Sequence, residues 1–160
     1  AKIAFGSDWS VTSANPYHQI ETAITRQSAS DITALENSPV DPEQNIPLFI
    51  EESVDLKTAI DAFTINAAFV NNNEKETGSI EVGKFADLVV LDQNLFEIET
   101  HDISETKALL TLFEGQVVHG DLAVPLDGDL HHFHRSSPTA LGLAAPSAKA
   151  SGRAAALALR

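Results

Sequence analysis

The chain opens with a short apolar segment, Ile3–Phe5, which ends at Gly6 and is followed closely by Asp8. An apolar run of this length that stops at glycine is typical of a buried β-strand. A strand buried on both faces lies inside a parallel sheet and needs neighbouring strands on both sides. No later part of the sequence is well placed to supply them, so this segment constrains the fold more than any other.

The rest of the chain shows helical patterns first and strand patterns afterwards. Pro16, preceded by turn residues, begins an amphipathic helix that is expected to extend to about Ala29. A second helix is expected from a cap at Asp55, with one apolar stripe that ends at Asn71. Three strands are then expected, the last two as a hairpin: Ala86–Leu91, Leu109–Phe113 and Gln116–His119.

Length and charge limit the class of protein. With 160 residues and 43% hydrophobic content, the chain can bury the core of one ordinary domain. A complete (β/α)₈ barrel needs about 250 residues. The net charge of −13 argues against nucleic acid or a membrane surface as partner, because both reward dense positive charge. All 23 acidic side chains lie in residues 1–130, so residues 131–160, with four basic ones, differ in character from the body.

Features that the sequence lacks bear on its possible binding sites and on its location. It has no cysteine, which excludes disulfides and cysteine-ligated zinc. No apolar run approaches the roughly 18–20 residues of a spanning helix, and no secretory signal opens the chain, so a cytoplasmic location is expected. The chain also lacks methionine and begins inside an expected buried strand, which favours a fragment of a longer protein.

Several segments resemble one known family. Gly6–Trp9, with Asn15–Pro16 and Thr25–Gln27, is similar to the last barrel strand and following helix of the amidohydrolase family 3 (YtcJ-like) metal-dependent hydrolases. Gly78–Asp92 resembles the segment by which amidohydrolases return to their small β-sandwich. Two further stretches resemble the family's late helix and its closing hairpin, respectively Ala59–Ala68 and Leu109–Val118.

The resemblance covers about residues 1–121 and implies an α/β fold, the C-terminal fragment of a (β/α)₈ metal-dependent hydrolase barrel. Residues 1–77 would be the last β/α unit with the helices that follow it, and residues 78–121 strands of the β-sandwich. Residues 122–160 have no family counterpart and are expected to be a low-complexity, disordered tail. Ser10 stands where the family usually has proline.

The resemblance also implies a function. In the family, the aspartate of the eighth strand binds a metal, takes a proton from the metal-bound water and passes it to the leaving amine, and that role carries over to Asp8. The parent enzyme would hydrolyse a C–N bond of a small amide-like substrate with a divalent metal, zinc being the expected one. The other ligands belong to absent strands, so this chain alone is expected to bind no metal and to be inactive.

Other roles for these residues remain open. Asp8 could instead cap the turn that follows it, a common role for aspartate before a loop rich in serine and threonine. Trp9 could line a substrate pocket or pack in a core or an interface. His18, ten residues after Asp8, is expected to be a surface residue rather than a metal ligand.

Three further groups have simpler interpretations than binding sites. His131, His132 and His134 could bind zinc or nickel adventitiously, but a solvated tail is the expected state. The spacing of Gly78, Gly83 and Lys84 fits no phosphate-binding motif, which makes these glycines turn residues. The acidic run around Glu97–Glu105 is expected to be a solvated surface.

A second function class is a non-catalytic module for interaction or oligomerisation. In that case the apolar Ile3–Phe5 strand and the apolar helix faces would be covered by another copy of the chain. A further alternative is pairing with a separate chain that carries the missing barrel portion. No nucleic acid or membrane partner is expected.

Overall fold

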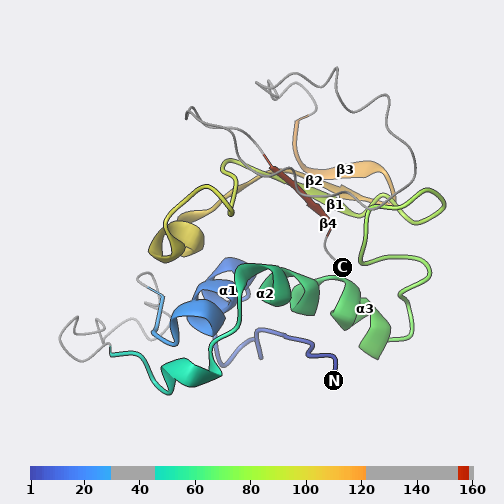
Figure 1. Cartoon of the computed structure of the whole chain (residues 1–160). Helices are drawn as coiled ribbons and strands as arrows, with labels where there is room; N and C mark the ends of the chain where they lie inside the picture. The colour runs from blue at the N-terminus through green and yellow to red at the C-terminus, as the bar shows by residue number, and fades with distance from the viewer. Residues whose placement is uncertain (30–45, 122–154, 159–160) are drawn as a thin grey trace.

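The computed structural model describes residues 1–29, residues 46–121 and the backbone of residues 155–158. A sheet lies on one side, helices α1, α2 and α3 form a second layer, and the N-terminal segment runs along the far side of the helices (Figure 1). The predicted histidine cluster, at positions 131, 132 and 134, lies outside the described residues. Within the described ranges, no helix has the length and apolar character needed to cross a bilayer.

Helix α1, Pro16–Thr25, begins where the sequence predicts. The Asn15 side chain caps it by accepting a hydrogen bond from the backbone N–H of Tyr17 at 3.0 Å, and proline occupies its first turn. The helix ends earlier than expected because Arg26 adopts a left-handed conformation, with φ of 59°. The Arg26 N–H still donates to the Thr22 carbonyl, which closes the last turn.

The second predicted helix is divided in two: α2, Leu56–Phe63, and α3, Ile65–Val70. The cap at Asp55 is confirmed, since its carboxylate accepts from the Thr58 N–H at 2.7 Å. The break falls at Thr64, whose φ of −117° and ψ of −99° are not helical. The Thr64 hydroxyl donates to the Ile60 carbonyl at 2.8 Å, so a local side-chain bond accompanies the break.

The sheet is antiparallel and has the order β3-β2-β1-β4. The predicted hairpin is confirmed by β2, Ala108–Phe113, and β3, Gln116–Gly120. Strand β1, Leu88–Leu91, begins two residues later than expected. The preceding residues, Ala86 and Asp87, instead accept hydrogen bonds from the turn of the hairpin. Strand β4, Ala155–Ala158, pairs with β1 and lies within the region expected to be a disordered tail.

The core lies between the sheet and the helices and includes a short 3₁₀ helix, η2, Thr100–Glu105. Ile103 of η2 is buried with Ile20 of α1 and Leu91 of β1. The buried carboxylate of Glu21 accepts from the Ser104 N–H at 2.8 Å, so a polar contact also joins α1 to η2. The acidic run is therefore solvated only in part: its charged side chains are exposed, but Ile103 and Ser104 are buried.

The opening segment does not form the predicted strand. In the described part of the chain no strand lies beside it, and a strand requires a hydrogen-bonded neighbour. The Phe5 N–H donates to the Ala62 carbonyl at 3.0 Å, and the rings of Phe5 and Phe63 meet edge to face with centroids 5.6 Å apart. The segment is thus anchored to α2 on one side, while Ile3 remains 44% exposed.

The buried phenol of Tyr17 should make the structure sensitive to alkali. Burial, and to a lesser degree the negative charge of Asp92, raises the pKa of Tyr17 to about 12. The folded state favours the neutral phenol, so this contribution to stability is complete below pH 10 and is lost as the pH rises toward 12. Tyr17 is the single tyrosine, so phenolate absorbance reports on it alone. We expect the phenolate absorbance of Tyr17 to rise with a midpoint near pH 12 in native buffer and near pH 10 in denaturant. Equal midpoints would contradict the burial of Tyr17.

Candidate functional site

Asp8 lies on a turn that follows the anchored opening segment. Its φ is 51°, in the left-handed region, and its carbonyl accepts from the Val11 N–H at 2.8 Å. The Thr12 hydroxyl donates to the Ser7 carbonyl, and the Trp9 N–H donates to the Ser7 hydroxyl at 3.3 Å. Backbone and hydroxyl groups thus satisfy this turn, and the Asp8 side chain remains exposed on a defined backbone.

The loop after Asp8 is fastened to α1. The Gln19 side-chain amide donates to the Ser13 carbonyl at 3.0 Å and to the Thr12 hydroxyl at 3.4 Å. The Ser13 hydroxyl accepts from the Asn15 N–H at 3.1 Å, immediately before the helix begins. With α2 holding Phe5 and α1 holding Thr12 and Ser13, the turn that carries Asp8 is fixed from both ends.

Trp9 lies beside Asp8 on the same turn and is 73% exposed. It packs in no core of the described residues, which leaves its large ring available to a ligand or to another chain. Its role as a substrate-pocket residue stays a prediction.

The described residues alone do not make a metal site. In residues 1–29 and 46–121, no group of three or more histidine, aspartate or glutamate side chains is arranged to hold a metal ion. A metal in a hydrolase is usually held by at least three protein ligands. Asp8 can supply one carboxylate, so its role as a metal ligand stays a prediction.

The prediction for His18 is wrong. His18 is only 5% exposed, and its Nδ1 has no hydrogen-bond partner in the described part of the structure. It lies one turn from Glu21 on α1, the helix that packs on η2. The sequence showed a polar residue near a helix start, and a local pattern could not show that this residue would be buried.

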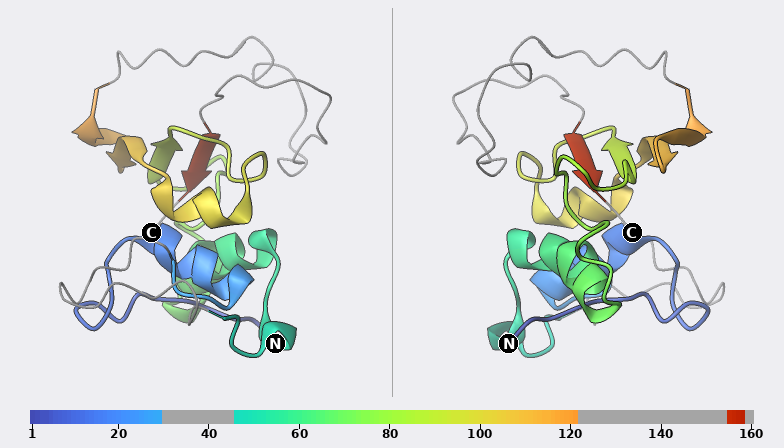
Figure 2. Two further views of the ribbon diagram at one scale, coloured as in Figure 1. Left: turned by 90° about the vertical axis from the view of Figure 1, so that its left-hand side faces the viewer. Right: turned by 90° about the vertical axis from the view of Figure 1, so that its right-hand side faces the viewer.

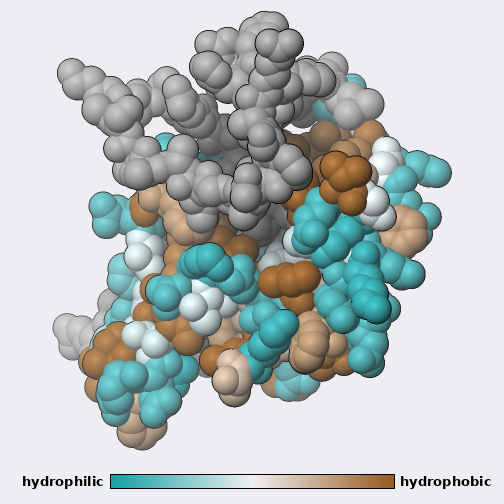
Figure 3. Space-filling view, turned by 45° about the vertical axis from the view of Figure 1, so that its right-hand side comes forward, coloured by the Kyte–Doolittle hydropathy of each residue, from teal (hydrophilic) through white to brown (hydrophobic). Residues whose placement is uncertain are grey.

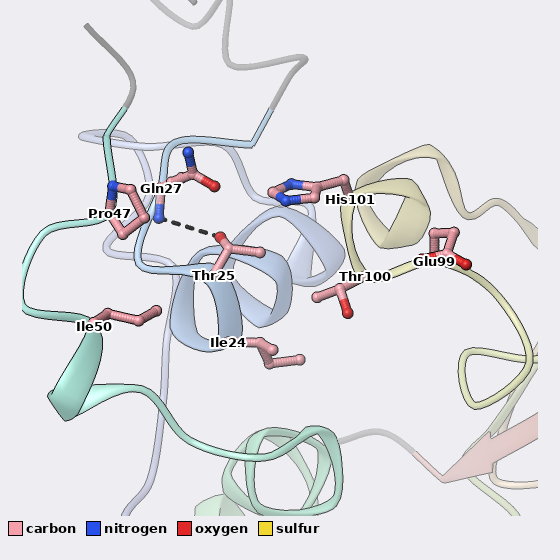
Figure 4. A pocket seen from close by; sticks show the side chains of 8 residues that line it. All are labelled: Ile24, Thr25, Gln27, Pro47, Ile50, Glu99, Thr100 and His101. Carbon is pink, nitrogen blue, oxygen red and sulfur yellow. Dashed lines mark hydrogen bonds between the residues drawn. The ribbon is translucent and has the colours of Figure 1, made fainter.

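A pocket of about 340 Å³ lies at the opposite end of α1 from Asp8 (Figure 4). Ile24, Pro47 and Ile50 form an apolar side, and Glu99, Thr100 and His101 come from the segment around η2. In it the Thr25 hydroxyl accepts from the Gln27 N–H at 3.2 Å. Helix α1 is about 15 Å long, so this pocket and the Asp8 turn are separate places.

The turn interpretation of the glycines is confirmed. Gly78 and Gly83 have φ of 85° and 97°, values that favour glycine. The Lys84 ammonium lies 2.5 Å from the Ser79 hydroxyl and 3.1 Å from the Glu81 carboxylate, so it is engaged within its own turn. Asp87, buried in the same stretch, accepts from the Glu114 N–H at 2.8 Å and from the Thr77 hydroxyl at 3.3 Å.

Comparisons with known proteins give one family model and several relatives. A family model described as "Amidohydrolase family" matches residues 1–119. The protein LONG AFTER FAR-RED 3 of Arabidopsis thaliana is 32% identical over 104 residues, which are 65% of this chain and 16% of that protein. An N-substituted formamide deformylase of Arthrobacter pascens is 28% identical over 114 residues, 71% of this chain and 18% of the enzyme.

A third relative is an imidazolonepropionase of Bdellovibrio bacteriovorus, 31% identical over 91 residues, 54% of this chain and 21% of the enzyme. The chain therefore spans about a fifth of the length of these relatives. No solved structure matches it significantly.

Proposed function

The chain belongs to the amidohydrolase family, and on that premise we propose that it is the C-terminal part of a metal-dependent hydrolase of the YtcJ-like branch. That enzyme hydrolyses a C–N bond of a small amide-like substrate. The formamide deformylase and the imidazolonepropionase among its relatives are named as acting on small molecules, which supports this substrate class.

The observation that carries the proposal is the position of Asp8 within the matched residues. Asp8 is exposed, on a turn that α1 and α2 hold at both ends. In (β/α)₈ barrels, catalytic groups lie at the C-terminal ends of the strands, on the loops that lead into helices. Residues 1–25 have a similar order of apolar segment, carboxylate-bearing turn and helix.

Asp8 acts in this proposal as one metal ligand and as the proton acceptor. A divalent metal, zinc being the expected one, supplies Lewis acidity at such a site. The Asp8 carboxylate accepts a proton from the attacking water and returns it to the leaving nitrogen, so one group serves as base and then as acid. Trp9, beside it, offers an apolar wall for the substrate.

This function requires further barrel strands beside the opening segment. Ile3, Trp9 and Val11 are 44%, 73% and 75% exposed, although the helices cover the other side of the segment. Parallel strands supplied by the rest of such an enzyme would cover these apolar groups. They would also bring the missing metal ligands to Asp8.

A chimera tests whether the chain completes such a barrel. Residues 1–119 replace the matching segment of the formamide deformylase, and hydrolysis of an N-substituted formamide is measured with metal content and circular dichroism. We expect a folded, metal-containing protein that hydrolyses the formamide. A folded chimera with bound metal but no hydrolysis would contradict the proposal, and so would one that folds without metal.

A second candidate function is a non-catalytic interaction module, favoured by the exposure of Ile3, Trp9 and Val11. Under this alternative the apolar segment binds another copy of the chain, and Asp8 serves only the turn. A chimera that folds and stays inactive would favour it.

A further inference from the structure

The pocket at the C-terminal end of α1 lies between two short 3₁₀ helices. Helix α1 has η2 on one side and a second 3₁₀ helix, η1, Ile50–Glu52, on the other (Figures 1 and 2). The pocket volume of about 340 Å³ is at the lower end of the range of about 300–1,000 Å³ that is typical of small-molecule sites. The mechanism proposed above uses Asp8 and Trp9, before the other end of α1, so this pocket has no role in it.

One wall of the pocket is apolar. Ile24 comes from the last turn of α1, and Pro47 and Ile50 come from the chain around the start of η1. Apolar side chains also face solvent elsewhere: on the face shown in Figure 3 they lie in separate patches among hydrophilic ones. Such isolated patches are normal for a protein surface. The pocket differs because its three apolar side chains line one cavity and can contact an apolar group from more than one side.

The opposite wall is polar and available to a ligand. Glu99, Thr100 and His101 come from the segment around η2, and His101 projects from η2 toward the end of α1 (Figure 4). Among the described residues, none of these three side chains makes a hydrogen bond or an ion pair. The Thr25 hydroxyl, in contrast, is already engaged, since it donates to a backbone carbonyl of α1 at 2.8 Å and accepts from the Gln27 N–H.

The charges around the pocket favour a cation. Glu99 is the one acidic side chain that lines it, and none of the described lysine or arginine side chains does. Two more carboxylates, Glu51 and Glu52, lie on η1. Arg26 is close in sequence, but its Nε donates to the Leu48 carbonyl at 3.0 Å and the residue does not line the pocket. Because the whole chain has a net charge of −13, a test must separate binding in the pocket from attraction to the surface.

We propose that this pocket binds a small primary ammonium compound whose apolar part is the size of a benzyl group. The apolar part contacts Ile24, Pro47 and Ile50. The ammonium group lies at the Glu99 carboxylate, and the Thr100 hydroxyl accepts a second N–H. An ammonium group has three donors and no acceptor, which matches carboxylate, hydroxyl and imidazole groups. For a ligand of about eight non-hydrogen atoms, the expected Kd is about 1 mM.

A nuclear magnetic resonance titration of the isotope-labelled full chain with benzylammonium at neutral pH tests the site. Methyl signals of Ile24, Thr25 and Ile50 report on the pocket, and those of Val82, a fully exposed residue outside it, report on the general surface. Benzyl alcohol keeps the ring without the charge, and methylammonium keeps the charge without the ring. We expect saturable shifts in the pocket with benzylammonium, and at least about threefold weaker binding of either reference compound.

Glu99→Gln should weaken the binding of benzylammonium about threefold. The matched control is Glu97→Gln, because Glu97 is an exposed carboxylate of the same segment that does not line the pocket, and the Kd should be unchanged. Absence of saturable shifts in the pocket, or equal affinity for benzylammonium and either reference compound, would overturn the proposal. Equal weakening by Glu99→Gln and Glu97→Gln would also overturn it, since the cation would then respond only to the acidic surface. The titration needs no metal and no catalysis, so its result is independent of the chimera.

Discussion

Replacing Asp8 by asparagine in the active chimera is expected to lower kcat at least about 1,000-fold, because an amide cannot accept a proton at neutral pH. Proton transfer by a positioned group contributes about 10²- to 10⁴-fold, and Asp8 is proposed to make two transfers in each cycle. Asp8→Glu keeps a carboxylate on the same turn and should recover part of the rate. Metal content is measured with the rates, so that loss of metal is distinguished from loss of proton transfer.

The matched control for this substitution is Asp102→Asn. Asp102 is an exposed carboxylate on η2, where its backbone carbonyl accepts from the Gln93 side chain at 3.2 Å. The control should hydrolyse the substrate at the rate of the unmodified chimera. Equal rates for Asp8→Asn and Asp102→Asn would remove Asp8 from the mechanism.

Gly78→Ala is expected to reduce the free energy of unfolding by about 3 kcal/mol. Gly78 is buried, and a Cβ there would lie 2.7 Å from the Ala68 Cβ and 2.9 Å from the Ile65 Cα of α3. Its φ of 85° adds backbone strain of about 1–2 kcal/mol for any residue with a side chain. The clash can be removed only if α3 moves, because one of the atoms that the added Cβ would meet is the backbone Cα of Ile65. Urea denaturation measures the loss.

Gly83→Ala separates the two causes. Gly83 has a φ of 97°, but a Cβ added there would have no atom of the described residues within 4 Å. Only the backbone strain applies, so the expected loss is about 1–2 kcal/mol. If Gly78→Ala and Gly83→Ala lower the free energy of unfolding by the same amount, then close packing against α3 does not explain the glycine at position 78.

Local chemistry made several elements predictable from the sequence. The helix start at Pro16, the cap at Asp55 and the hairpin turn at Glu114–Gly115 depend on residues within a few positions of one another, so each could be recognised from spacing alone. Gly78 and Gly83 were identified as turn residues for the same reason. Their backbone conformations are ones that few other residues adopt.

The candidate site was predictable in part. The sequence predicted a candidate carboxylate at Asp8, directly after a short apolar segment. In the structure Asp8 lies on a turn that Thr12, Ser13 and Gln19 hold in place. The strand expected before it is absent from the described residues, since strand formation depends on a neighbour that no local pattern can supply. No group of three or more metal-ligating side chains occurs among the described residues, and a local pattern cannot predict one, because a ligand set is assembled from segments that are distant in sequence.

The sequence by itself determined where α1 and α2 begin, where the chain turns and which residue carries the candidate carboxylate, because these depend on neighbours along the chain. Tertiary structure alone decided that His18 and Glu21 are buried, that the Ser104 N–H donates to the Glu21 carboxylate, and that β1 takes β4 as its second neighbour. Burial and strand pairing are properties of surfaces that meet across long stretches of chain. A pattern of residue types predicts that a segment has an apolar surface. Only the folded structure shows which other segment covers that surface.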